Sequence, residues 1–248
     1  MPDPYCDSPM KKTPGGKISF YVRGEMSDMA KRLGLYCAAV LLLGFGIVLN
    51  TKAGLGVGSI NTFPYAVSEI TPLSLGTVTT LLYFVFIGAQ LMIYRKIDLK
   101  VLLQIPFSWV MGRLIDFYDE ILNFTVDAMA VRFAVLGAAI VCTAIGAYVM
   151  VTMDLIPNPA DGMARAVGYM LKKEFGQGKL IFDCVMIAVT AAVSLVFAHR
   201  IIGIGIGTVL SALLIGRLIQ LLARVLGPAM QQILAESRKE NVSFSACE

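Results

Sequence analysis

Apolar residues occur in six long runs that are separated by short polar segments. Each run is close to the about 20 residues that an α-helix needs to cross a hydrocarbon core of about 30 Å. The pattern therefore predicts an all-α, polytopic transmembrane helical bundle with about six spans. We place these spans at residues 33–50, 75–94, 101–122, 129–152, 180–198 and 202–222.

The composition points to the same class. Of the 248 residues, 57% are hydrophobic and only 15% are charged, and the mean hydropathy is +0.74. A soluble domain of this length could not bury so much apolar surface. The chain is therefore predicted to be an integral membrane protein whose main partner is the lipid bilayer.

The positive charges alternate along the chain in a way that predicts an orientation. They precede span one and follow spans two, four and six, whereas the loop after span three is acidic. Because cytoplasmic segments are enriched in Lys and Arg, both termini are predicted to be cytoplasmic. The basic residues are Lys11, Lys12, Lys17, Arg23, Lys31, Arg32, Arg95, Lys96, Lys100, Lys172, Lys173, Lys179, Arg224, Arg238 and Lys239.

Two segments that are too short to cross a bilayer have the same layout. Residues 50–58 are rich in glycine and precede a short helix over 59–69, and residues 154–160 contain two prolines and precede a short helix over 161–174. Each half then holds three spans, an odd number, so the second half would insert in the opposite sense. The sequence predicts an inverted 3+3 repeat, with halves at 33–124 and 125–226 and cytoplasmic tails at 1–32 and 227–248.

The lengths of these short segments suggest two re-entrant half-helices. A nine-residue extended run covers about 30 Å, and an 11-residue helix then rises about 16 Å back. Ser59 and Asp161 are the expected N-caps, near mid-membrane, where helix amino ends present N–H groups and a positive dipole. The alternative is that both segments are surface loops followed by helices that lie along the interface.

Two arginines are the most unusual charges, because they lie inside apolar spans. Arg113 and Arg217 occur in matching Gly-Arg-Leu-Ile sequences 104 positions apart. A guanidinium keeps its proton and is costly in hydrocarbon, so such a residue indicates a functional site. We expect both to face the interface between the halves and to hold the negative group of a solute. In the alternative, they only pack helices, with Arg113 paired to Asp116 or turned to the interface.

Other polar residues are predicted to surround the same site. Asp183 lies inside span five and would be a counter-charge, with a role as proton carrier as the alternative. Asp154 and Lys52 lie in the two irregular segments and complete the charge-relay candidates. The neutral candidates for substrate binding are Asn50, Asn61 and Asn158, with Gln104 beside them.

Several other classes of function have no support in the sequence. No catalytic motif, metal-ligand spacing or nucleotide-binding loop is found, so an enzyme, a metal, a cofactor and a nucleic-acid partner are not expected. The five cysteines form no disulfide framework or CxxC pair. The glycine run at 203–207 is predicted to serve helix packing.

The segment LLLGFGIVLNTKAGLGVGSINTF at 41–63, the segment SLGTVTTLLYFVF at 74–86 and the Gly-Arg pair at 112–113 carry a resemblance to a known family. In these features the chain resembles the YitT/YczE-like family of uncharacterised bacterial membrane proteins over most of residues 33–225. The resemblance implies a multi-pass protein of the cell inner (plasma) membrane, and it implies no substrate.

These observations lead to two hypotheses. The first is a secondary-type transporter or exporter of a small anionic or amphipathic solute, which binds at the repeat interface near the bilayer midplane. The second is a non-transporting membrane scaffold or regulatory subunit. The identity of the solute and a homo-oligomeric assembly are left open.

Overall fold

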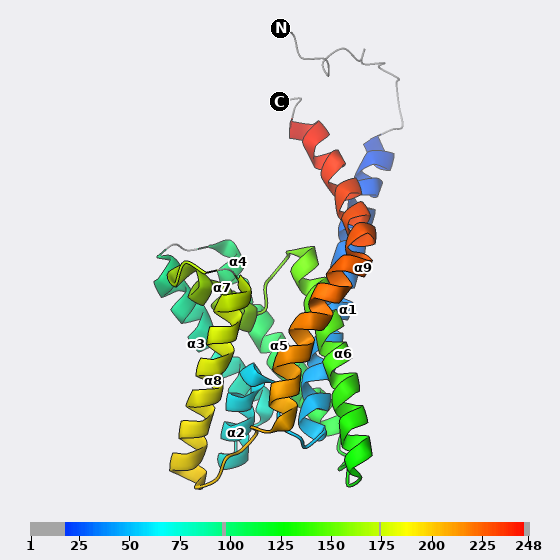
Figure 1. The fold of residues 1–248 in the computed structure, drawn as a ribbon. Helices are drawn as coiled ribbons and strands as arrows, with labels where there is room; N and C mark the ends of the chain where they lie inside the picture. Colours follow the sequence, from blue (N-terminus) through cyan, green and yellow to red (C-terminus); the bar gives the residue numbers. More distant parts are fainter. Residues whose placement is uncertain (1–17, 96–97, 174, 246–248) are drawn as a thin grey trace.

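The computed structural model describes the backbone of residues 18–245 except 96–97 and 174, and the side chains of residues 30–227 with the same gaps. Every regular element in this part of the chain is a helix, as predicted (Figure 1). The predicted basic residues 11, 12, 17 and 96 lie outside it. The helices are α1 (Ile18–Lys52), η1 (Ser59–Asn61), α2 (Thr62–Ile70), α3 (Leu75–Tyr94), α4 (Leu99–Leu102), α5 (Gln104–Ile121), α6 (Met129–Met153), α7 (Pro159–Met170), α8 (Phe175–Ala198) and α9 (Ile206–Ser245).

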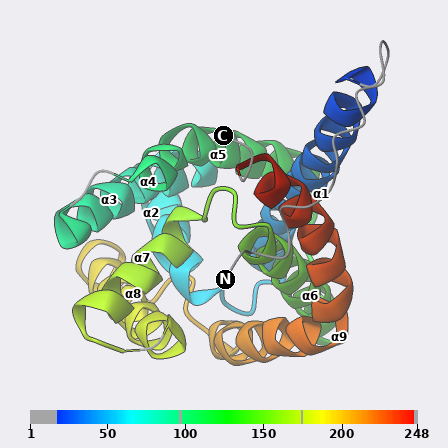
Figure 2. The ribbon, with the colours of Figure 1, turned by 90° about the horizontal axis from the view of Figure 1, so that it is seen from above.

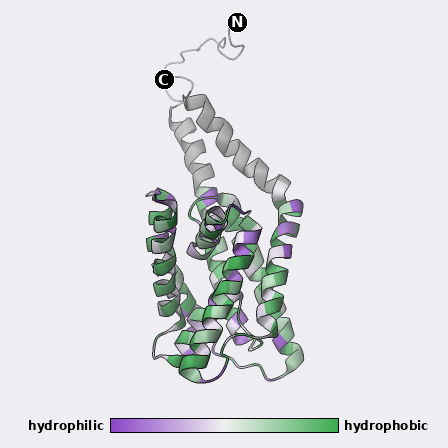
Figure 3. Ribbon diagram, turned by 60° about the vertical axis from the view of Figure 1, so that its left-hand side comes forward, coloured by the Kyte–Doolittle hydropathy of each residue, from purple (hydrophilic) through white to green (hydrophobic). Residues whose placement is uncertain are grey.

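Among the described residues, five helices are long and apolar enough to cross a membrane, one fewer than predicted. They are Ala30–Lys52 of α1, α3, α6, α8 and Ile206–Gly227 of α9. Apolar residues predominate along them (Figure 3). The predicted span 101–122 is instead divided between α4 and α5, next to Pro106, which has no N–H to donate to the preceding turn. Four charged residues on α5 also set it apart: Arg113, Asp116, Asp119 and Glu120.

The helices α1 and α6 pack along one another and make the most extensive helix–helix contact among the described residues. Two glycines allow the close approach. A Cβ at Gly46 would lie 2.7 Å from the backbone nitrogen of Thr143, and one at Gly146 would lie 2.9 Å from the carbonyl oxygen of Ala39. Small residues let helix backbones approach closely in membranes. Gly46 and Gly146 are 100 residues apart in the sequence.

The order long helix, loop, short helix, long helix occurs twice. η1 and α7 begin 100 residues apart, at Ser59 and Pro159, and so do α3 and α8, at Leu75 and Phe175. Each short helix packs on a long helix of the other half, α2 on α8 and α7 on α3. α2 and α7 lie toward opposite ends of the bundle (Figure 1), and α7 and α8 are grouped on the side away from α1 and α6 (Figure 2).

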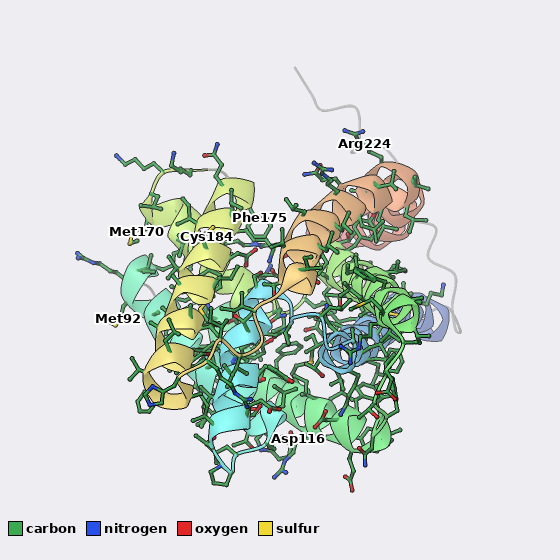
Figure 4. The ribbon with its side chains drawn as sticks, turned by 60° about the horizontal axis from the view of Figure 1, so that its bottom comes forward. Met92, Asp116, Met170, Phe175, Cys184 and Arg224 are labelled. Carbon is green, nitrogen blue, oxygen red and sulfur yellow. The ribbon has the colours of Figure 1, made fainter. Side chains whose placement is uncertain are left out.

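The last helix of each half is packed differently. α5 packs against both α1 and α3, whereas α9 packs against α6 and is not packed along α8. Figures 1 and 4 show α8, with Phe175 and Cys184, diverging from α9, which carries Arg224. The surroundings of one glycine on each helix show the same difference in packing. A Cβ at Gly112 of α5 would lie 2.6 Å from the carbonyl oxygen of Gly76 on α3, while Gly216 of α9 has open space around it.

Gly205 and Gly207 of the run at 203–207 pack against the loop before η1, whereas the prediction was packing between helices. The backbone N–H of Val57 donates to the carbonyl of Gly203 (2.8 Å), and that of Gly207 donates to the carbonyl of Leu55 (2.7 Å). This short pairing joins the loop before η1 to the start of α9. The start of α1 and the end of α9 project from the same end of the bundle (Figure 1).

Candidate functional site

The start of α7 is fixed by an asparagine and a proline. The side-chain oxygen of Asn158 accepts a hydrogen bond from the N–H of Ala160 (3.3 Å), and Pro159 begins the helix. Proline is favoured at this position because its φ angle is already helical. The prediction that Asp161 is the N-cap is therefore wrong. Asp161 lies in the first turn, where a carboxylate still interacts well with the positive helix end.

The start of the first short helix differs from the prediction in a similar way. Ser59 is the first residue of η1, whose N-cap is Gly58, so Ser59 is not itself a cap. The backbone carbonyl of Ser59 accepts a hydrogen bond from the Thr62 hydroxyl (2.7 Å). Asn61 precedes α2 and makes no side-chain capping bond. The Ser59 side chain is consequently available to another element.

That element is α8, which meets the starts of both short helices. The Lys179 ammonium lies 3.1 Å from Oδ1 of Asp161 in α7. One turn further along α8, the Asp183 carboxylate lies close to the Ser59 side chain. Lys179 and Asp183 lie about 6 and 12 Å along the axis from the first residue of α8, at 1.5 Å per residue. We call Ser59, Asp161, Lys179 and Asp183 the central cluster.

Asp183 is the most deeply placed charge of the central cluster. Only 6% of its surface is exposed, and its Oδ1 has no hydrogen-bond partner among the described residues. Further along the same face of α8, the hydroxyl of Thr190 lies 2.9 Å from that of Thr62, and Ser194 is also buried. A polar strip thus continues from the central cluster along α8.

Two glutamines hold the start of α7 in place. Gln90 of α3 and Gln104 of α5 exchange two amide hydrogen bonds of 3.0 and 3.2 Å, and Gln90 also donates to the carbonyl of Pro159 (3.2 Å). The buried Tyr83 side chain lies close to Asn158. Buried polar groups that are fully hydrogen-bonded make a structure rigid. These contacts position α7 relative to α3 and α5.

The two arginines are not part of the central cluster. Arg113 is exposed, and its guanidinium lies over the ring of Trp109, 5.7 Å from the centroid. Because Gly112 turns toward α3, the adjacent Arg113 is directed outward, so its expected placement between the halves is wrong. Asp116 does not pair with it and instead accepts bonds from the Gly76 N–H (2.7 Å) and the Ser74 hydroxyl (2.9 Å).

Arg217 is also exposed. It lies on the side of α9 opposite Ile215 and Leu218, which pack against the core cluster containing Leu136 and Ile140. α9 and α8 are not packed together, and the cation beside Asp183 is Lys179 and not Arg217. A role of either arginine in binding a solute stays a prediction.

The remaining candidates lie away from the central cluster. Lys52 forms an ion pair with Asp119 (2.8 Å) beside a cavity of about 270 Å³, and Asp154 pairs with Lys100 (2.7 Å) on an exposed surface. Asn50 is buried and donates to the Ser211 hydroxyl (3.0 Å), which joins α1 to α9.

Other exposed residues mark the outer surface. Met92 and Met170, at the ends of α3 and α7, point away from the bundle (Figure 4).

Three of the four residues of the central cluster were predicted as site residues from the sequence: Ser59, Asp161 and Asp183. Asn158, also a candidate, caps α7. Lys179 was assigned to a cytoplasmic loop because it follows Lys172 and Lys173. Its position four residues before Asp183 could have revealed it, because this spacing places both on one helix face. Gln90 and Tyr83 gave no comparable signal.

Long apolar helices around a buried polar cluster define a polytopic helical membrane protein. The chain belongs to a family of unknown function, DUF6198, whose model matches residues 30–224. No curated protein and no solved structure matches the chain. Membership in a family of unknown function agrees with the expectation of an uncharacterised membrane protein family.

Proposed function

We propose that this protein is a secondary-type transporter of a small anionic or amphipathic solute, which binds at the central cluster. One observation carries the proposal: the starts of two short helices, one from each half, contact successive turns of α8 through Ser59–Asp183 and Asp161–Lys179. Secondary transporters commonly bind their solutes where interrupted helices from two repeats meet near the bilayer midplane.

The chemistry of these helix starts favours a negative group on the solute. The first N–H groups of a helix have no partner within the helix, and the macrodipole is positive there. Lys179 adds a cation between the two starts. We therefore assign the anion to Lys179 and the backbone N–H groups of the two short helices, because both arginines are exposed on outer helix faces.

The repeated element order supports an inverted repeat with re-entrant α2 and α7. The two short helices lie toward opposite ends of the bundle, which is what opposite insertion of the two halves would produce (Figure 1). α5 packs on α3, whereas α9 does not pack along α8. We propose that this difference belongs to one state of an alternating cycle. In the opposite state, α9 would approach α8 and α5 would separate from α3.

The more specific resemblance to the YitT/YczE-like family remains part of this proposal. Membership in a family of unknown function is compatible with it. Location in the cell inner membrane follows from the same resemblance.

Lys179→Gln is expected to lower solute uptake about tenfold. The substitution removes a charge-assisted hydrogen-bond donor worth about 1.5–3 kcal/mol. The matched control is Lys100→Gln, which removes the exposed Lys100–Asp154 pair and should leave uptake unchanged. Both variants and the parent protein are reconstituted in proteoliposomes and given a metabolite mixture, and the internal contents are identified by mass spectrometry.

Two outcomes would contradict the proposal. Equal uptake by Lys179→Gln and Lys100→Gln would place the solute elsewhere. A correctly folded parent protein that accumulates no metabolite, in either orientation of the vesicle gradient, would favour a scaffold or regulatory subunit.

A further inference from the structure

The charges of the central cluster do not balance. It contains two carboxylates, Asp161 and Asp183, and one ammonium, that of Lys179. The Lys179 ammonium lies 3.1 Å from Oδ1 of Asp161, and these two charged groups neutralise one another. Asp183, which is 6% exposed, is left with the nearby Ser59 side chain and an unpartnered Oδ1.

The groups that face Asp183 come from three elements. Lys179 lies one turn away on α8 itself, Ser59 of η1 contributes its hydroxyl, and Asp161 of α7 contributes a second negative charge. Tyr83 of α3 is near Asn158 and Asp161. The described charges around Asp183 are therefore the Lys179 ammonium, which is already paired with Asp161, and the Asp161 carboxylate itself.

A buried carboxylate without a matching cation is costly at this depth. Charged side chains inside a membrane are paired, face water or become neutral. The two helix ends supply partial positive charge, about half an elementary charge each, but the carboxylate Oδ1 receives no hydrogen bond. The smallest cation that can neutralise this oxygen without a set of metal ligands is a proton.

We propose that Asp183 binds and releases a proton during the working cycle, so that H⁺ is the coupling ion. This inference rests on the proposed transport function for its role, although the protonation itself is independent of any solute. The proton adds to a carboxylate oxygen of Asp183 from one side of the membrane, and it leaves from the same oxygen toward the other side. No other bond is made or broken.

Protonation of Asp183 would also favour binding of an anion. The ionised carboxylate lies close to Ser59, the first residue of the first short helix. Once the carboxyl group is neutral, the Asp161–Lys179 pair has no net charge and both helix ends are free to attract a negative group. Proton and anion would then bind together, and a monoanion would cross as a neutral pair.

The proton on Asp183 can be observed by infrared difference spectroscopy of the whole protein in lipid, without a solute. As the pH is raised, the C=O stretching band of a protonated carboxylic acid should disappear in the parent protein. Asp183→Asn should lack this band, and the matched control Asp154→Asn, which changes an exposed aspartate, should keep it. The Asn variant has nearly the shape of the protonated acid, and its melting temperature verifies that it folds.

A parent spectrum with no acid band attributable to Asp183 would overturn the inference. A second result would also overturn it: the parent protein shows no acid band, but sodium changes its spectrum at fixed pH, and Asp183→Asn abolishes that change. The cation at Asp183 would then be a metal ion. The transport function is tested separately. An acid band of Asp183 without uptake of any metabolite supports the proton site and rejects transport. Uptake that does not depend on a pH gradient, in a protein without the band, supports transport and rejects the proton site.

Discussion

Gly112→Ala is expected to lower the stability of the protein strongly, whereas Gly216→Ala is expected to leave it unchanged. An added Cβ at residue 112 would lie 2.6 Å from the carbonyl oxygen of Gly76 and would also clash with the Thr80 hydroxyl. The carbonyl belongs to the backbone of α3 and cannot move aside locally. Overpacking of this kind costs about 1–3 kcal/mol or more.

The equivalent glycine of the second half provides the control. Gly216 lies in the same Gly-Arg-Leu-Ile sequence, and a Cβ there meets nothing within 4 Å. Alanine is also the better helix former, so Gly216→Ala should melt at the same temperature as the parent protein or slightly higher. Thermal unfolding of the three proteins in one detergent tests this. Equal melting temperatures would mean that the α3–α5 crossing is looser than described.

Gly56→Ala is expected to have the second large effect. Gly56 has a φ of 107°, a conformation that L-residues rarely adopt, and an added Cβ would lie 2.6 Å from the backbone nitrogen of Gly205. The conformational cost alone is about 1–3 kcal/mol. The clash would separate the loop before η1 from the start of α9, breaking the Val57–Gly203 and Gly207–Leu55 hydrogen bonds.

Gly58→Ala is the control for this substitution. Gly58 has a φ of −54°, and a Cβ at this position would only reach the Asn61 amide at 4.0 Å. Melting temperatures should therefore separate the two variants clearly. Retention of full stability by Gly56→Ala would contradict the tight loop conformation.

Hydropathy was sufficient to predict most of the fold. The predicted span at 75–94 agrees with α3, and the span at 129–152 differs from α6 by one residue. Both short helices were expected within a few residues of their positions, because glycines and prolines interrupt the apolar pattern there. The prediction for residues 101–122 was less accurate, since hydropathy alone does not show a helix break beside Pro106 or a face that carries four charges.

The candidate site was harder to predict because periodicity does not reveal which helix face is packed. Arg113 and Arg217 were chosen for their unusual location in apolar runs, but the neighbouring Gly112 determines that Arg113 points outward. Lys179 was not recognised as a site residue because it follows Lys172 and Lys173, which were assigned to a cytoplasmic loop. Tertiary pairing of residues far apart in the sequence, such as Ser59 with Asp183, decided the site, and a single sequence carries no record of such pairs.

The sparse packing of α9 has a practical consequence for handling the protein. Only Gly207, Thr208 and Ser211 are buried within the Ile206–Gly227 segment, so acyl chains of the surrounding lipid must solvate most of this helix. Its tilt will then respond to bilayer thickness more than that of the central pair α1 and α6. Short-chain detergents, which form a thin and curved micelle, should displace this helix before any other, so nanodiscs or native lipid are the appropriate environment for measuring activity.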